Sequence, residues 1–502
     1  MTKGSKEGMA EDHDIGRKML TGSIWSFGVN SLQQILGLAR IIILARLLLP
    51  SDFGLLGIAV LTLYGLDVFS QTGFQQALVN KKTDISSDLN AVWTLLVGRG
   101  ILLFVILMLL APFIADFFAT TEAIPVLQVM GISMILQGLT NPGIILFLKD
   151  LDFKRQYLFR FSGVLADFIV CIGAALILQN VWALVFGLVA KDLTLMAMSY
   201  IIHPYRPRFD LDLKKVRSLS NYGIWILITS ALVFLLIEGD DILVGRLLGV
   251  AALGLYQMAY AISNTPSTEI SQIIAQVAFP VYSKLQDDLD SLKELFLGIL
   301  RLTALLSFLL IGFLVALAPD ITMVFLGEVW SPIIPLIQIL AWWGLMRGLG
   351  EVSAALFMAI GRPRVNSKLQ FVQVVLLFAL FYPLITQYGL IGISIAVVAS
   401  AIPSFFLSIN AINSILGVQA KEPFALLFYP LAMSVSGTAM VFLVRHALFP
   451  TPDPFSFLAL LGVYAVIVLM GIYLLERFSD YRVWTILRSY SRIRTGDSWN
   501  AR

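Results

Sequence analysis

Apolar runs about the length of a membrane-spanning helix follow one another from Ile24 to Leu475, and short polar segments separate them. A run of 18 or more apolar residues is typical of a transmembrane helix. Because the runs do not alternate as barrel strands do, we expect an all-α polytopic membrane protein with fourteen transmembrane helices. The helices are expected at about 23–47, 54–78, 90–117, 123–148, 157–178, 181–202, 219–248, 252–282, 293–318, 331–360, 367–387, 389–414, 424–447 and 456–476.

Positive charge is confined almost entirely to alternate loops. The segments rich in Lys and Arg are 80–88, 149–156, 203–217, 283–294, 361–368 and the C-terminal tail. The loops between them, such as "LQNVW" and "TQYG", contain neither residue. Cytoplasmic loops of membrane proteins carry the excess of Lys and Arg. We therefore predict a multi-pass membrane protein with both termini in the cytoplasm.

Composition supports the membrane assignment and narrows the function. The chain is 58% hydrophobic and 13% charged, whereas soluble proteins average about 25% charged residues. A net charge of +3 gives no reason to expect nucleic acid as a partner. The single cysteine, Cys171, and the three scattered histidines form no metal-binding pattern, and Cys171 is expected to be buried. No expected loop is long enough to hold a catalytic domain, which favours a transporter over an enzyme.

One stretch of the sequence is repeated two hundred residues later. "ARLLLPSDFGLLGIA" (45–59) returns as "GRLLGVAALGLYQMA" (245–259), with Gly54 in register with Gly254, and "IPVLQ" (124–128) returns as "IPLIQ" (334–338). This predicts two parallel six-helix repeats related by a pseudo-two-fold axis along the membrane normal. We expect a V-shaped, two-lobe transporter with two additional C-terminal helices. The expected parts are a cytoplasmic tail (1–22), an N-lobe (23–217), a C-lobe (218–420), helices 13 and 14 (421–478) and a second cytoplasmic tail (479–502).

Several motifs in combination resemble a known family. They include "LARLLLPSDFGLLGIA" (44–59), "DVFSQTGFQQALVNKK" (67–82), "DDILVGRLLGVAALGLYQMAYAISN" (240–264), "AFPVYSKLQDDLDSLKELF" (278–296) and the region 324–368. The chain resembles the Wzx-type polysaccharide flippases, in particular the colanic-acid-exporter (WzxC-like) branch of the multidrug/oligosaccharidyl-lipid/polysaccharide superfamily. The resemblance implies movement of undecaprenyl-diphosphate-linked oligosaccharide units from the cytoplasmic to the periplasmic leaflet, for exopolysaccharide or lipopolysaccharide synthesis. It also implies a location in the bacterial cytoplasmic (inner) membrane.

Three arginines within the expected helices are candidate substrate ligands. Arg99, Arg301 and Arg347 are expected about 12 to 20 Å from the cytoplasmic ends of their helices. Guanidinium groups form bidentate, charge-assisted bonds with phosphate, so we expect the three to converge on a diphosphate or acidic sugars. The alternatives are that Arg99 and Arg301 reach to the cytoplasmic interface, and that Glu351, one turn after Arg347, neutralises it.

A second set of charges is expected nearer the periplasm. In the register of the repeat, Arg40 is equivalent to Asp240, and the pair would form a periplasmic gate between the lobes. The family that the chain resembles has an Asp before a Gly-Arg pair. In this sequence that Asp corresponds to Asp240, and the pair is Gly245–Arg246. Glu238 and Asp241 are candidate sites for a coupling H⁺ or Na⁺. Glu351 is a further candidate residue for the gate or for ion coupling. The alternative is a local ion pair within one lobe. "GLTNPGI" (138–144) and "SNTPST" (263–268) are expected to break their helices.

The expected mechanism is alternating access, with no cofactor beyond a coupling ion. Expected partners are the lipid-linked oligosaccharide, membrane lipids, and the exopolysaccharide polymerase and export proteins, and we expect a monomer without nucleic acid. Two other transporters fit the same architecture: a peptidoglycan-precursor flippase and a multidrug cation antiporter. A membrane-embedded glycan polymerase is the alternative from another class, and it should carry a sizeable catalytic loop. A structural scaffold would not explain buried charges within the spans.

Overall fold

The computed structural model describes residues 32–70, 89–149, 152–210, 223–418 and 421–478. Within these residues the regular secondary structure is helical, and nine helices are long and apolar enough to cross a membrane. The expected all-α membrane architecture is therefore confirmed in its coarse form, while the count of fourteen and the internal repeat stay predictions. Both expected tails and the first part of the first helix lie outside the described residues. Contacts divide the chain into two units, Met1–Gly254 and Leu255–Arg502.

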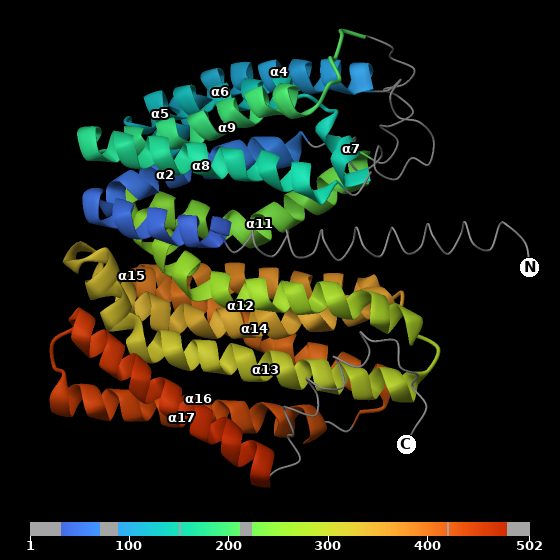
Figure 1. The fold of residues 1–502 in the computed structure, drawn as a ribbon, viewed down its shortest axis with the longest axis vertical. Coiled ribbons are helices and arrows are strands. Elements are labelled where there is room, and N and C mark those ends of the chain that lie inside the picture. The colour runs from blue at the N-terminus through green and yellow to red at the C-terminus, as the bar shows by residue number, and fades with distance from the viewer. Residues whose placement is uncertain (1–31, 71–88, 150–151, 211–222, 419–420, 479–502) are drawn as a thin grey trace, which may run out of the picture. The chain divides into compact units, whose positions relative to one another are not determined.

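The first unit contains the helical segment 32–47 and the helices shown in blue to green in Figure 1. Two of them, α8 (Phe153–Leu178) and α9 (Trp182–Ile202), lie side by side as a hairpin. Cys171 on α8 is fully buried, as expected, and packs with Leu44 and Leu48 in the hydrophobic core that joins segment 32–47 to this hairpin. The other helices of this unit are α2 (Pro50–Phe69), α4 (Leu89–Phe117), α5 (Ala123–Met130), α6 (Ile132–Leu139), α7 (Ile144–Lys149) and α11 (Gly223–Leu248).

The expected fourth helix is divided into α5, α6 and α7. The break between α6 and α7 falls at Thr140–Gly143, as expected from the proline in "GLTNPGI". On the N-terminal side of this break, the backbone of α6 packs directly against the backbone of α4. A Cβ atom on Gly100 would overlap the carbonyl of Met134, and one on Gly138 would overlap the carbonyl of Leu96. Small residues allow such close approach between membrane helices.

A short extended strap, residues 203–210, follows α9 and lies against the start of α4. The Asn90 side-chain oxygen accepts hydrogen bonds from the Tyr205 hydroxyl (2.6 Å) and from the Arg208 backbone N–H (2.8 Å). The Thr94 hydroxyl accepts one from the Asp210 N–H (2.9 Å), and the Asn141 side chain donates to the Tyr205 carbonyl (2.7 Å). These side chains satisfy the backbone polar groups of a segment that has no helix to satisfy them.

In the second unit, α13 (Leu289–Asp320) packs against α14 (Ile333–Ala359) and α16 (Lys421–Leu448). The preceding helix, α12 (Val250–Lys284), begins at the end of the first unit. It continues through Pro266, so the expected break at 263–268 is not found. A π-helical turn (Ile321–Leu326) and a 3₁₀ turn (Glu328–Trp330) connect α13 to α14.

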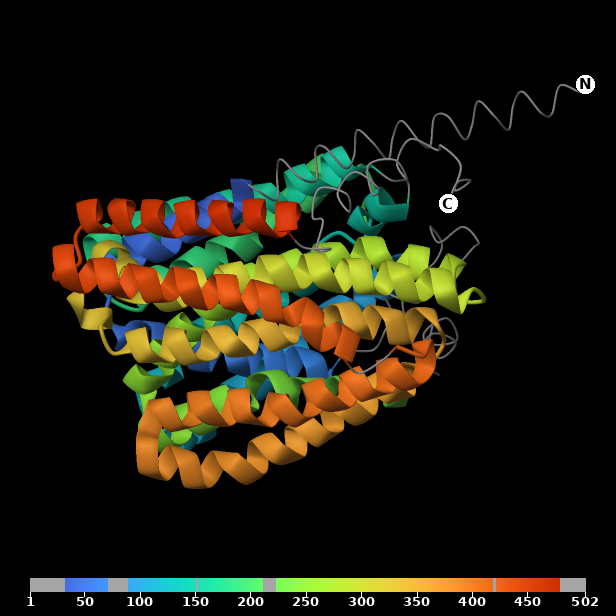
Figure 2. The same cartoon turned by 90° about the horizontal axis from the view of Figure 1, so that it is seen from below.

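The long element α15 (Pro363–Leu416) consists of two antiparallel helices rather than one. Gly389 has a left-handed φ of 54° and marks the reversal, which Figure 2 shows in orange. The Ser404 hydroxyl donates to the Leu369 carbonyl (3.0 Å), which places the two halves side by side. The two halves correspond to the helices expected at 367–387 and 389–414.

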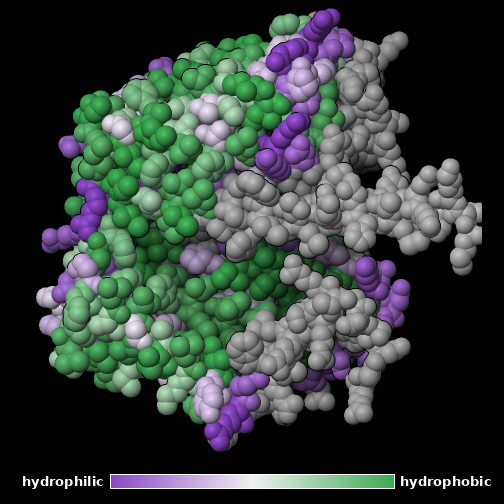
Figure 3. Space-filling model, in the orientation of Figure 1, coloured by the Kyte–Doolittle hydropathy of each residue, from purple (hydrophilic) through white to green (hydrophobic). Residues whose placement is uncertain are grey.

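The last two helices are packed tightly on α13. The Tyr464 hydroxyl of α17 (Pro454–Phe478) donates to the Leu309 carbonyl (2.6 Å), and Thr438 of α16 donates to the Gly312 carbonyl (3.2 Å). A Cβ atom on Gly312 would overlap the side chains of Ser434 and Tyr464. In Figure 3, apolar residues cover the sides of the helices and hydrophilic residues gather at helix ends, as expected for a surface that faces lipid.

Candidate functional site

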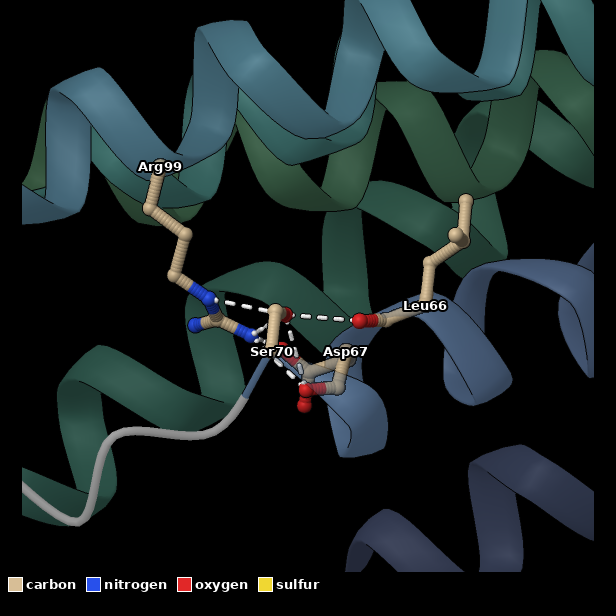
Figure 4. Close-up of polar contacts among 4 residues, drawn as sticks. All are labelled: Leu66, Asp67, Ser70 and Arg99. Atoms are coloured by element: carbon tan, nitrogen blue, oxygen red, sulfur yellow. Dashed lines mark hydrogen bonds and ion pairs between the residues drawn. The ribbon is translucent and has the colours of Figure 1, made fainter. Parts of the chain in front are cut away.

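Arg99, the first expected substrate ligand, is bound to a carboxylate of α2 and to the hydroxyl of Ser70, the residue that follows α2. Its Nη2 donates to the Asp67 side chain, to the Asp67 carbonyl (2.9 Å) and to the Ser70 hydroxyl (2.7 Å), and Nε donates to Ser70 (3.0 Å). Figure 4 shows the remaining nitrogen pointing away from this cluster. The pair joins α4 to the C-terminal end of α2, so the charge of Arg99 is already largely balanced.

Arg347 on α14 has a different environment. Its Nη1 donates to the Tyr260 hydroxyl of α12 (3.4 Å), which also accepts a hydrogen bond from the Trp343 indole N–H (3.0 Å). The Arg347 side chain is half-buried. Among the described residues it forms no ion pair, with Glu351 or with another carboxylate. Arg347 is thus a cation within a membrane-spanning helix whose hydrogen-bond partner is a neutral hydroxyl.

The expected convergence of the three arginines stays a prediction. Arg99 belongs to the first unit, whereas Arg301 and Arg347 belong to the second. Arg301 is half-buried on α13. Arg99 is bound by a carboxylate, whereas Arg347 is bound by the hydroxyl of Tyr260 on the neighbouring helix α12.

Arg40 pairs with Asp167, the local alternative to the expected gate. Its Nε lies 3.2 Å from a carboxylate oxygen of Asp167 on α8, and its Nη2 lies 3.8 Å from the Cys171 sulfur one turn further along. Gly187 of α9 faces this carboxylate, and a Cβ atom there would collide with it at 2.6 Å. The Arg40–Asp240 gate stays a prediction for another state of the transport cycle.

The acidic residues expected near the gate lie on α11. Asp240 is buried, and Glu238 and Asp241 are half-buried. The Asp241 backbone N–H donates to the Asp240 carboxylate (3.1 Å). Their role as coupling sites stays a prediction. Among the described residues no group of three or more His, Cys, Asp or Glu side chains has the arrangement of a metal site.

A further buried ion pair lies at the end of α13. Asp320 pairs with Arg445 of α16, and its other oxygen accepts a hydrogen bond from the Ser456 hydroxyl at the start of α17 (3.4 Å). Asp453 in turn accepts from the Ser456 backbone N–H (2.6 Å). This cluster joins three helices at one end of the second unit, and its charges are balanced within the protein.

Sequence reasoning missed the roles of two residues. Asp167 is visible in the sequence as a charge within an apolar run, which marks it as a functional candidate, but its partner comes from another helix. Tyr260 has no such signal, because tyrosine is ordinary in a membrane helix. It acquires significance only through its contacts with Trp343 and Arg347.

Comparisons with known proteins agree with this architecture. The family model described as "Polysaccharide biosynthesis protein" matches residues 43–335. The lipopolysaccharide biosynthesis protein WzxC of Escherichia coli (strain K12) is 27% identical over 409 residues, which cover 80% of each chain. The teichuronic acid biosynthesis protein TuaB of Bacillus subtilis (strain 168) is 29% identical over 58% of this chain and 60% of its own.

Solved structures share the fold. The lipid II flippase MurJ in an inward closed conformation superposes with a TM-score of 0.73 at 13% identity, covering 91% of this chain and 99% of its own. An inward-facing multidrug transporter of the MATE family gives 0.57 at 16% identity, covering 76% and 95%. At such identities these matches show the fold alone. The family model covers more than half of the sequence, and the chain therefore belongs to the polysaccharide biosynthesis protein family.

Proposed function

We propose that this protein is a transporter, specifically a flippase that moves undecaprenyl-diphosphate-linked oligosaccharides from the cytoplasmic to the periplasmic leaflet by alternating access. Membership of the polysaccharide biosynthesis protein family supports this, as do relatives named for the synthesis of lipopolysaccharide and teichuronic acid. The fold shared with a lipid II flippase supports movement of a polyprenyl-linked head group rather than its chemical conversion.

The environment of Arg347 carries the proposal. A guanidinium in a membrane-spanning helix is costly, and such residues normally face a partner or a watery cavity. Among the described residues Arg347 has no carboxylate partner, and its bond to the neutral Tyr260 hydroxyl leaves its positive charge in place. A diphosphate supplies the missing negative charge, and the adjacent Trp343 offers an aromatic face to a sugar ring.

The alternative functions fit this site less well. A multidrug cation antiporter needs an acidic binding site, whereas Arg347 would repel a cationic drug. A glycan polymerase needs positioned acid and base groups at the membrane surface, and this family assignment gives no reason to expect them. A peptidoglycan-precursor flippase shares the anionic head group and is distinguished by the sugars alone.

We propose a location in the bacterial inner membrane with both termini in the cytoplasm, because the Lys-rich and Arg-rich loops all lie on one side in the expected topology. The proposed partners are the lipid-linked oligosaccharide, bilayer lipids, and the polymerase and export proteins that would use the product. We propose that the protein works as a monomer.

The direct test is flipping in proteoliposomes. The purified chain is reconstituted with fluorescent polyprenyl-diphosphate glycans, and the fraction that reaches the other leaflet is measured by dithionite quenching. Wild-type protein should flip the glycan lipid, and Arg347→Gln should reduce the rate at least tenfold, which corresponds to about 1.4 kcal/mol. Arg347→Lys should restore part of the rate, because it keeps the charge without the planar guanidinium.

Arg364→Gln is the matched control, since Arg364 is exposed in the first turn of α15 in the same unit. Lipid II and a cationic dye in place of the glycan lipid test the alternative substrates. Failure of wild-type protein to flip any polyprenyl-diphosphate glycan would refute the proposed function. Equal rates for Arg347→Gln and Arg364→Gln would refute the role of Arg347 and leave the transport activity standing.

A further inference from the structure

Asp167 lies within the span formed by α8, with its side chain almost entirely buried. The residue is 7% exposed, and the charged partner at 3.2 Å is Arg40 of the helical segment 32–47. The two residues come from helices that pack together through the core around Cys171. The pair is therefore a charged contact between segment 32–47 and α8, beside the apolar one.

The bonding of this pair is incomplete. The Asp167 Oδ1 atom and the Arg40 Nε atom are both buried without a hydrogen-bond partner. Buried polar atoms in proteins are nearly always hydrogen-bonded, so a buried carboxylate oxygen without a hydrogen bond is unusual and indicates a specific role. The ion pair supplies charge balance, but one oxygen of Asp167 remains a vacant acceptor within a membrane-spanning helix. A proton is the smallest ligand that such an oxygen can take.

The charges that act on Asp167 come from two neighbouring elements. Arg40 lies on segment 32–47, and Lys191 and Asp192 lie on α9. The α6 side chain of Gln137 donates to Asp192 (3.4 Å). When Asp167 is ionised, the two positive charges of Arg40 and Lys191 balance the two negative charges of Asp167 and Asp192. Other ionisable groups on the elements packed against α8 and α9 are Asp52, Tyr64 and Asp67 of α2, Lys149 of α7 and Arg46 of segment 32–47, while α5 has none.

We propose that Asp167 is a proton-binding site whose occupancy controls its hold on Arg40 during export. The proton adds to the free Oδ1 and converts the carboxylate into a neutral carboxylic acid. Arg40 then loses its counter-charge, and a buried cation without a partner is strongly destabilised. Segment 32–47 is thereby released from α8 until the proton leaves. This inference rests on the proposed function, because it links a proton to the movement of the glycan lipid.

The first test measures proton binding without transport. Infrared difference spectra of the purified protein in nanodiscs are recorded between acidic and neutral pH, and protonated carboxyl groups are followed by their C=O band. Asp167→Asn should remove one component of this band, and Asp67→Asn, which alters a second Arg–Asp pair between helices of the same unit, should leave that component in place. A band that is unchanged in Asp167→Asn would overturn the proposal.

The second test imposes a gradient of one pH unit across proteoliposomes, acidic on the side that receives the glycan. One coupled proton should shift the final transbilayer ratio of glycan lipid about tenfold. Asp167→Asn should flip the lipid to the same ratio with and without the gradient, and Asp167→Glu should recover the response. Asp67→Asn should keep it. A sodium gradient at constant pH should have no effect, and a response to sodium would overturn the assignment to protons.

The outcomes separate the two proposals. If wild-type protein flips the glycan lipid but ignores the pH gradient, the proton site is refuted and the flippase stands. If it flips no glycan lipid, the proposed function fails, while the infrared test still decides whether Asp167 binds a proton. Should Asp167→Asn fail to fold, Arg40→Gln takes its place, and it should likewise abolish the response to the gradient.

Discussion

Gly54 and Gly254 meet at a helix crossing where neither position has room for a side chain. A Cβ atom on Gly54 would overlap the carbonyl oxygen of Val250, and a Cβ atom on Gly254 would overlap the carbonyl oxygen of Pro50. The sequence repeat relates Pro50 to Val250 and Gly54 to Gly254. In a two-fold contact residue i meets j and residue j meets i, and this crossing of α2 and the start of α12 has that reciprocity.

The crossing should be sensitive to a single methyl group. Gly54→Ala forces the α2 and α12 backbones apart, and overpacking of this kind costs about 1–3 kcal/mol. We expect a lower midpoint of thermal unfolding, measured by tryptophan fluorescence in detergent micelles. Gly173→Ala is the control, because no atom lies within 4 Å of a Cβ there and alanine favours the helix. Equal midpoints for the two variants would contradict the close approach.

The helices could be predicted from the sequence far better than the contacts between them. Runs of apolar residues indicate the spans, and Gly389 and the proline in "GLTNPGI" mark a turn and a break that the structure has. Pro266 misleads, because α12 continues through it. A proline in a membrane helix removes one hydrogen bond, and its neighbours can compensate for that loss.

The partners of the charged residues were beyond the sequence. Arg40 pairs with Asp167 and Arg99 with Asp67, while the expected contact of Arg40 with Asp240 stays a prediction. Which side chains meet depends on how each helix is rotated about its axis. Helices that are apolar all round carry little information on rotation, since no polar face distinguishes solvent from core. The register of the repeat made Arg40 equivalent to Asp240. Two residues at equivalent positions of a repeat need not be in contact.

The strap 203–210 should respond to alkaline pH through Tyr205. Burial, followed by the negative charge of Asp210, raises the pKa of the Tyr205 phenol. An unfolded tyrosine has a pKa of about 10. The contribution of this residue to stability is thus fully present below about pH 10 and is lost as the pH rises through the higher value of the folded state.

A difference titration checks this. The tyrosinate absorbance of Tyr205→Phe, subtracted from that of wild type, should show a group that titrates above pH 10. Asn90→Ala removes the acceptor of the Tyr205 hydroxyl and should lower the midpoint. Thr94→Ala leaves that bond intact, because Thr94 accepts from Asp210, and should change the midpoint less. A midpoint at or below pH 10 in wild type would contradict the burial of Tyr205.

The reversal within α15 should require glycine at position 389. Gly389 has φ 54° and ψ −130°, a conformation that is nearly restricted to glycine. Gly389→Ala should lower stability by about 1–3 kcal/mol through backbone strain, although no neighbouring atom blocks the methyl group. Gly462→Ala, in the helical interior of α17 with equally open surroundings, should not lower it. The free energy of unfolding of the two variants is compared by denaturant titration in mixed micelles. Equal losses of stability would rule out backbone strain as the cause.

Two ion pairs connect α13 to α16. The contribution of each pair to the free energy of unfolding should depend on how deeply it is buried. Asp320 is 1% exposed and pairs with Arg445, whereas Lys293 and Glu422 are 27% and 37% exposed. Breaking a buried pair leaves an uncompensated charge and costs about 3–5 kcal/mol, but an exposed pair contributes about 0–1 kcal/mol. Asp320→Asn should therefore strongly reduce the free energy of unfolding, and Glu422→Gln should barely change it. The double variant Asp320→Asn/Arg445→Met removes both charges and should recover much of the loss. If Asp320→Asn and Glu422→Gln were equally stable, the buried pair would not hold α16 and α17 on α13.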